Sequence, residues 1–255
     1  MNKSSISIII PVYNESESIS LLIDEIQKVM FLNKFSYELI IINDGSKDNT
    51  YEVLKDLSNK VKELTVINLR KNYGQTAALA AGFDNATGQI VISLDGDLQN
   101  DPNDIPKLID AINDGYDLIC GWRFNRKDKL LDRRIPSKIA NKIIAMVTGI
   151  YLHDYGCSLK AFRKEVIDDI KLYGELHRFI PVLADNEGAR IKEVKVNHRS
   201  RKYGSSKYGI DRTFRVLMDL LTVWFMNKFL TRPMYVFGFI GIISILSSLL
   251  ISSYL

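Results

Sequence analysis

The sequence is poor in the residues that build metal centres and disulfide frameworks. Its 255 residues include only two cysteines and three histidines. Cys120 and Cys157 have neither the spacing of metal ligands nor the number that a disulfide framework needs, which fits a reducing compartment. His153, His177 and His198 lack the i, i+4 spacing of a histidine metal site. We therefore expect neither a zinc site nor a disulfide-stabilised fold.

Glycine-rich phosphate-binding loops are also missing. A GxGxxG turn after the first apolar run would indicate a Rossmann dehydrogenase, and GxxxxGK(S/T) would indicate a P-loop protein, but neither occurs. The net charge of +4 is too small to indicate a nucleic-acid partner. Basic residues are instead concentrated in residues 195–215, where Asp211 is the only acidic residue. The sequence thus excludes both phosphate-binding loops and leaves a local basic segment to be explained.

Charge is absent from the C-terminal residues 234–255. A helix of this length spans about 33 Å, enough to cross the apolar core of a bilayer. Lys228 and Arg232 precede the segment and no basic residue follows it, so the positive-inside rule places the preceding domain in the cytoplasm. We expect a transmembrane helix over 233–255, and the sequence leaves open whether the natural chain continues past Leu255 into a second span.

Apolar strand-like runs alternate with segments of helical spacing through the first 120 residues. Strands are predicted at 6–10, 38–42, 64–69, 90–94 and 117–120, and helices at 16–30, 49–60, 75–85 and 104–113. Further along, helices are predicted at 129–150, 180–189 and 211–230, with a strand at 191–196. This order predicts an α/β fold, a Rossmann-like, mostly parallel sheet with helices on both faces. Residues 210–232 would form an amphipathic helix on the membrane surface, or alternatively a packed core helix.

The most informative polar segment is Asp95-Gly96-Asp97-Leu98-Gln99, which directly follows the predicted strand at 90–94. Acidic turns also follow the first two strands, in PVYNE and NDGS. Because the carboxyl ends of parallel strands meet at one edge of a sheet, these turns should lie together. Carboxylate and amide oxygens suit Mg²⁺ or Mn²⁺, which usually arrive with substrate phosphates. The pattern favours a nucleotide diphosphate ligand, although a solvated acidic turn is the simpler alternative.

Several motifs in this order resemble those of the family 2 glycosyltransferases, which have the GT-A fold. They are PVYNE, NDGS, RKNYGQTAALAAGF and DGDLQ. Later motifs resemble the polyprenyl-phosphate sugar transferases, the group that includes dolichol-phosphate mannosyltransferases and bacterial undecaprenyl-phosphate glucosyltransferases. These motifs are Gly121-Trp122-Arg123, Arg133-x-x-x-Ser137-x-x-x-Asn141, His177-Arg178-Phe179-Ile180-Pro181 and Arg201-x-x-Gly204-x-Ser206-Lys207-Tyr208. The resemblance covers about residues 5–255, with one departure: the bacterial relatives usually carry two C-terminal spans, and only one is visible.

The resemblance implies a catalytic domain at 1–209 that moves a sugar, with inversion, from a nucleotide diphosphate sugar to a polyprenyl phosphate. A UDP-sugar and undecaprenyl phosphate are favoured, at the cytoplasmic face of the inner or plasma membrane, for the synthesis of a cell-envelope glycan. It assigns the donor pocket to Pro11, Tyr13, Glu15, Ile42, Asp44, Asp95 and Gly96, and the Mg²⁺ or Mn²⁺ ion to Asp97 and Gln99. It assigns Arg201 and Lys207 to a mobile loop over the diphosphate, and Arg123, Arg133 and Ser137 to the lipid phosphate. Asp97, Arg123 and Arg133 would be the catalytic residues.

The residues leave several alternatives open. A lipid phosphate is already ionised at neutral pH and needs no general base, whereas a saccharide or protein hydroxyl acceptor would need one. A processive polysaccharide synthase would carry a QxxRW motif, which is absent. A catalytically silent membrane scaffold, or basic loops that only attract anionic lipid, would fit the same charges. Gly238, Gly241 and Ser244 give the span a face of small residues on which copies of the chain could pack, which leaves a homo-oligomer open.

Overall fold

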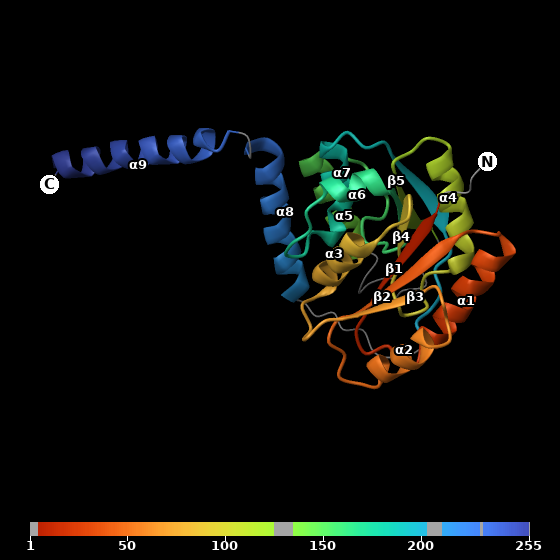
Figure 1. The fold of residues 1–255 in the computed structure, drawn as a ribbon. Helices are drawn as coiled ribbons and strands as arrows, with labels where there is room; N and C mark the ends of the chain where they lie inside the picture. The colour runs from red at the N-terminus through yellow and green to blue at the C-terminus, as the bar shows by residue number, and fades with distance from the viewer. Residues whose placement is uncertain (1–4, 125–134, 203–210, 230–231, 255) are drawn as a thin grey trace.

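The computed structural model describes residues 5–124, 135–202, 211–229 and 232–254 (Figure 1). The strands are β1 (Ile6–Val12), β2 (Tyr37–Asn43), β3 (Leu64–Asn68), β4 (Ile90–Ser93), β5 (Leu118–Arg123), β6 (Lys160–Arg163) and β7 (Ile191–Val196). The helices are α1 (Ile19–Leu32), α2 (Thr50–Ser58), α3 (Gln75–Asn85), α4 (Ile105–Asn113), α5 (Ile135–Thr148), α6 (Lys164–Asp169), α7 (Ile180–Asn186), α8 (Asp211–Phe229) and α9 (Met234–Tyr254). Two short 3₁₀ helices, η1 (Pro102–Asp104) and η3 (Leu176–Arg178), complete the described elements.

The strands form one seven-stranded sheet in the order β3-β2-β1-β4-β6-β5-β7. The pairs β1–β2, β1–β4, β2–β3 and β5–β7 are parallel. Strand β6 is antiparallel to both of its neighbours, β4 and β5. The prediction of a mostly parallel α/β sheet is therefore confirmed, and β6 is the strand that the sequence pattern did not reveal.

Both faces of the sheet are covered, as the unbroken apolar strands require. Alternate side chains of β1 enter different clusters: Ile8 and Ile10 pack with α1 and α4, whereas Ile9 packs with α3 and α7. Helix α3 lies close to the sheet at Gly82, where an added Cβ would come within 2.3 Å of Ile9 Cγ2. This two-sided packing fixes the sheet and leaves its carboxyl edge available for a site.

The two C-terminal helices differ in what they bury. On α8, Leu220 and Val223 are buried in the same cluster as α3 and α7, while Leu221 is exposed. None of the described residues of α9 is buried, and it extends away from the rest of the molecule (Figure 1). In the described part of the chain, α9 is the one helix long and apolar enough to cross a membrane. It lies within the segment 233–255 for which the sequence predicts a span, while α8 packs on the domain along one face.

Candidate active site

The carboxyl ends of β1 and β4 come together through a glycine. An added Cβ at Gly96 would lie 2.7 Å from Val12 Cγ1, so any other residue would have to displace the Val12 side chain. The next side chains along β1's turn are half-buried, among them Tyr13 and Glu15. The predicted meeting of the PVYNE and DGDLQ motifs at one sheet edge is therefore present in the structure.

Asp44, at the end of β2, holds the loop that precedes α3. Its Oδ1 accepts a hydrogen bond from the Tyr73 backbone N–H at 2.7 Å, and its Oδ2 accepts one from Gly74 N–H at 2.9 Å. The neighbouring Gly45 has a φ of +63°, and an added Cβ would lie 2.3 Å from the Lys71 carbonyl carbon. Asp44 thus ties the motif that contains Tyr73 to the second strand.

Asp95, the first of the two acidic residues after β4, contacts the start of α3. Its Oδ1 accepts a hydrogen bond from Gln75 Nε2, at the start of α3, at 2.8 Å. Burial raises the pKa of Asp95, while a hydrogen bond from Ser158 and the charge of Lys160 act against that rise. The Asp95 carboxylate therefore lies between the start of α3, the first residue of β6 and the turn before β6.

Asp97 and Gln99 share one cation, the guanidinium of Arg201. Arg201 Nη2 lies 2.6 Å from Asp97 Oδ2 and 3.5 Å from Gln99 Oε1. Burial and the neighbouring Asp95 carboxylate raise the pKa of Asp97 to about 6, and the charge of Arg201 counters them. The turn itself requires a positive φ of 63° at Leu98. The two predicted metal ligands are therefore adjacent and already attract a positive charge.

Arg201 reaches this position because the segment after β7 lies along the acidic loop. The Arg199 backbone N–H donates to Gln99 O at 2.9 Å. The Arg199 side chain pairs with Glu25 on α1 and with Asp101, each at 2.7 Å. Arg201, one of the two cations of the predicted mobile loop, thus lies at the site, whereas residues 203–210, including Lys207, lie outside the described residues.

The oxygen atoms of Asp97 and Gln99 fit a hard divalent cation such as Mg²⁺ or Mn²⁺. The described residues contain no group of three or more His, Cys, Asp or Glu side chains that could enclose a metal alone. An ion here would therefore need further ligands from a bound diphosphate and water, which is how Mg²⁺ is usually held. The protein groups present suit such a shared site.

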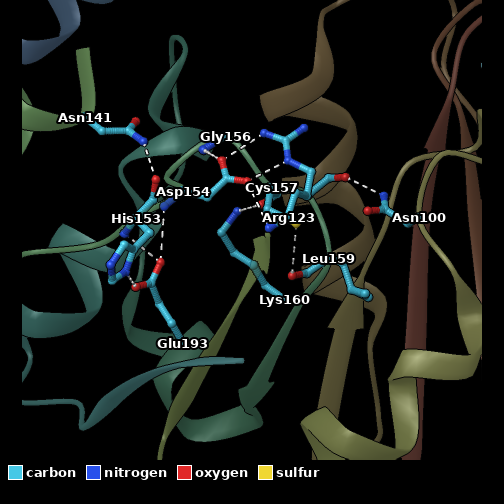
Figure 2. Close-up of polar contacts among 11 residues, drawn as sticks. Asn100, Arg123, Asn141, His153, Asp154, Gly156, Cys157, Leu159, Lys160 and Glu193 are labelled. Carbon is cyan, nitrogen blue, oxygen red and sulfur yellow. Dashed lines mark hydrogen bonds and ion pairs between the residues drawn. The ribbon is translucent and has the colours of Figure 1, made fainter. Parts of the chain in front are cut away.

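Arg123, at the end of β5, faces Asp154 rather than open solvent (Figure 2). Its Nε and Nη2 donate to Asp154 Oδ2 and Oδ1 at 2.6 and 2.8 Å. Of the other predicted phosphate-binding residues, Arg133 lies outside the described residues. Ser137 lies in α5, in a part where the side chains are not described. Asp154 was not predicted from the sequence, because it follows a histidine in a stretch with no helical or strand periodicity.

Lys160 is a second functional candidate that the sequence did not reveal. It begins β6 and is only 4% exposed, and its Nζ donates to the Cys157 carbonyl oxygen. Because a buried ammonium needs compensating charge, its proximity to Asp95 matters: its positive charge lowers the pKa of that carboxyl. Only the missed antiparallel strand brings this lysine to the site, between β4 and β5.

Two predicted or singled-out residues have interior positions. The Ile42 side chain is fully buried and packs against α3, while its backbone pairs with Pro11 near the carboxyl end of the sheet. His177 is also buried, and its Nδ1 lies 2.7 Å from Thr76 Oγ1. Burial, helped by the charges of Arg178 and Lys160, lowers the pKa of His177 to about 3. Its imidazole is therefore neutral over the physiological range.

Comparison with known proteins gives relatives over most of the chain. A model of the family described as glycosyl transferase family 2 matches residues 7–171. Dodecaprenyl-phosphate galacturonate synthase of Rhizobium johnstonii is 44% identical over 241 residues, which cover 93% of this chain and 71% of that protein. Undecaprenyl-phosphate 4-deoxy-4-formamido-L-arabinose transferase of Aeromonas hydrophila is 40% identical over 218 residues, 85% of this chain and 67% of the relative.

Among solved structures, glucosyl-3-phosphoglycerate synthase from Mycobacterium tuberculosis, in complex with Mn²⁺ and UDP-glucose, has the same fold. It matches with a TM-score of 0.63 at 18% identity, over 87% of this chain and 78% of that one. At this identity the likeness concerns the fold alone, and it confirms the predicted GT-A architecture. Together with the family model and the two curated relatives, it leads to one conclusion: the chain belongs to glycosyl transferase family 2.

Proposed function

We propose that this protein transfers a sugar from a nucleotide diphosphate sugar, favouring a UDP-sugar, to a polyprenyl phosphate at the cytoplasmic face of the membrane. The observation that carries the proposal is the pair of opposite charges at one sheet edge. Asp97 and Gln99, just after β4, contact the guanidinium of Arg201, and Arg123 lies at the end of β5. The names of the two curated relatives, both of which contain a polyprenyl phosphate, support the same reaction class.

On the donor side, Asp97 and Gln99 would hold Mg²⁺ or Mn²⁺ together with the diphosphate. When bound, that ion supplies stabilisation for the negative charge that develops on the departing nucleoside diphosphate. Arg201 adds a second positive charge, since it already lies 2.6 Å from Asp97. Pro11, Tyr13, Glu15, Asp44, Asp95 and Gly96 would shape the remaining pocket, with Lys207 as a further cation.

On the acceptor side, Arg123, Arg133 and Ser137 would bind the phosphate of the lipid. A phosphate monoester has a second pKa near 6, so its oxygen is a competent nucleophile at neutral pH without a general base. The attack would displace the nucleoside diphosphate from the anomeric carbon and invert its configuration. The guanidinium groups suit this role because Arg binds phosphate oxygens in a planar fork.

The membrane arrangement follows from the C-terminal helices. We assign residues 1–209 to the catalytic domain, 210–232 to an interfacial helix and 233–255 to a transmembrane helix. Lys228 and Arg232 precede α9, which supports a cytoplasmic catalytic domain. This arrangement would present the sheet edge to a lipid phosphate at the membrane surface.

The proposal is tested by a donor screen with the detergent-solubilised full chain. Undecaprenyl phosphate is incubated with Mg²⁺ or Mn²⁺ and a panel of UDP- and GDP-sugars that includes UDP-galacturonate, and the lipid is analysed by mass spectrometry. We expect one donor to add one glycosyl unit to the lipid phosphate and to release the nucleoside diphosphate. The Asp97→Ala variant is the inactive control. A sugar found on a hydroxyl acceptor instead, or no lipid product with any donor, would contradict the proposal.

A further inference from the structure

The turn from His153 to Ser158 lies between the two sides of the candidate site. At one end, Asp154 binds Arg123 (Figure 2). At the other, Ser158 Oγ accepts a hydrogen bond from Asn100 Nδ2 at 2.8 Å, close to the acidic loop after β4. The turn therefore contacts both the predicted acceptor arginine and the predicted donor loop, and no role was assigned to it from the sequence.

Asp154 holds the Arg123 guanidinium in one orientation. Besides the two guanidinium hydrogen bonds at 2.6 and 2.8 Å, the Asp154 carboxylate accepts backbone N–H groups from Arg123 at 3.3 Å and Gly156 at 3.2 Å. The side chains of Arg123 and Asp154 are only 15% and 4% exposed. A buried, two-bond pair of this kind fixes the plane of the guanidinium as well as its position.

The turn that carries Asp154 is itself attached to other elements. Glu193 on β7 accepts the backbone N–H groups of His153 and Asp154 on its Oε1, at 2.8 and 3.2 Å. Its Oε2 lies 2.7 Å from His153 Nδ1. From α5, Asn141 Nδ2 donates to the His153 carbonyl oxygen at 2.7 Å (Figure 2). The turn that carries Asp154 is thus anchored by side chains of β7 and α5, in addition to its contacts with Arg123.

We propose that Asp154 is a positioning residue that orients Arg123 toward the phosphate of the lipid acceptor, an inference that rests on the proposed function. Two physical effects oppose each other here. The negative charge of Asp154 reduces the attraction between Arg123 and a phosphate, whereas the fixed orientation removes the entropy cost of ordering a long side chain. The buried geometry makes orientation the larger effect, so removal of Asp154 weakens acceptor binding.

The test is a set of binding measurements on the full chain in detergent. Isothermal titration gives the Kd of undecaprenyl phosphate, with undecaprenol as the lipid that lacks the phosphate, and separately the Kd of UDP with Mn²⁺. For Asp154→Asn we expect undecaprenyl phosphate to bind on the order of 10-fold more weakly, with UDP–Mn²⁺ binding unchanged. Asp117→Asn is the matched control. Asp117 also pairs with arginines, but it directly precedes β5, at the opposite end of the strand from Arg123.

A double variant separates action through Arg123 from action elsewhere. If Asp154 acts only through Arg123, Arg123→Lys/Asp154→Asn binds the lipid no more weakly than Arg123→Lys alone. Additive losses would overturn the inference, as would tighter lipid binding by Asp154→Asn or a loss of UDP–Mn²⁺ binding in that variant. If Arg123→Lys bound undecaprenyl phosphate more weakly but Asp154→Asn bound it normally, the inference about Asp154 would be wrong and the proposed function would stand. If the unsubstituted chain bound undecaprenol as well as undecaprenyl phosphate, the proposed function itself would fall.

Discussion

The proposed donor and acceptor sides of the sheet edge differ in the sign of the charge that the strands hold in place. On the donor side, the Asp97 carboxylate follows β4 directly, and its cationic partner, Arg201, belongs to the segment after β7. On the acceptor side, the residue at the end of the strand is the cation Arg123, and Asp154 binds its guanidinium through two hydrogen bonds. The donor side therefore has carboxylates available to a cation, whereas the acceptor side has a guanidinium whose orientation is fixed by Asp154.

This difference bears on which contacts can exchange. Arg201 Nη2 makes one short contact with Asp97, and Nη1 lies 3.9 Å from Glu15 Oε1, so a divalent ion would have only one close contact to displace. The Arg123–Asp154 pair has two side-chain hydrogen bonds and is nearly buried, so its separation is costly. We infer that the donor side exchanges its cation during the reaction and that the acceptor side keeps its ion pair.

The largest expected effect is that of Asp97→Ala on the donor side. Removal of the carboxylate takes away the charged ligand of the predicted ion, so Mn²⁺-dependent binding of UDP should be lost. Isothermal titration with UDP, with and without Mn²⁺, measures it. Asp114→Ala, which removes an exposed carboxylate remote from the site, is the control. If Mn²⁺ still strengthened UDP binding in Asp97→Ala, the metal assignment would be wrong.

Arg201→Gln should change two affinities in opposite directions. Without the guanidinium, Asp97 and Gln99 lose the cation that competes with a metal, so Mn²⁺ alone should bind more tightly, as measured from the free Mn²⁺ signal in electron paramagnetic resonance. UDP–Mn²⁺ should bind about 10-fold more weakly, because a charge-assisted contact to the diphosphate is lost. Arg190→Gln, on an exposed arginine that pairs with Asp117, is the control. A parallel fall in both affinities would show that Arg201 does not exchange with the metal.

The pH dependence of nucleotide binding and of stability tests the raised pKa of Asp97. Asp97 must lose its proton to bind a metal, and its pKa is about 6, so UDP–Mn²⁺ affinity should weaken as the pH falls from 7.5 through 6 to 5. The same raised pKa means that ionised Asp97 costs stability, a cost that grows from pH 4 to 7. In the absence of metal, Asp97→Asn should therefore melt at a higher temperature at pH 7.5. Equal melting temperatures at that pH would contradict the raised pKa.

The smallest effect concerns His177, which lies in the core rather than on either side. Its pKa is lowered to about 3 in the folded state, so the unfolded chain binds an extra proton between about pH 3 and 6.5. Its stabilising contribution is complete above pH 6.5 and is lost as the pH falls. In His177→Gln, the fall in melting temperature between pH 7 and 5 should be smaller by a few degrees. An unchanged fall would show that His177 does not cause this acid sensitivity.

Much of the donor half could be predicted because its signals are local. The helix predicted at 75–85 is α3 to the residue, and the first four strands lie where continuous apolar runs indicated. Strand β6 was missed because it has only four residues, two of them basic, and its antiparallel pairing is invisible in an alternating pattern. The whole acceptor half depends on this strand, which separates β4 from β5.

The site could be predicted where several of its polar residues are close together in the sequence, as they are in the turn after β4. The partners of those residues could not be predicted, because they come from distant parts of the chain. Asp44 binds backbone N–H groups of the loop before α3, and Asp154 binds the end of β5. A side chain's partner depends on which strands become neighbours, and the position of Lys160 depends on the same pairing. The roles of Arg133, Ser137 and Lys207 stay predictions.

The central claim is that donor and acceptor bind to opposite sides of one sheet edge. It is tested most directly by two dissociation constants, for UDP–Mn²⁺ and for undecaprenyl phosphate, measured in the same detergent for Asp97→Ala and Arg123→Lys. The account predicts a crossed result: Asp97→Ala loses UDP–Mn²⁺ binding and keeps the lipid, whereas Arg123→Lys weakens lipid binding and keeps UDP–Mn²⁺. If both variants lost the same ligand, or each lost both, the division of the site into two sides would be wrong.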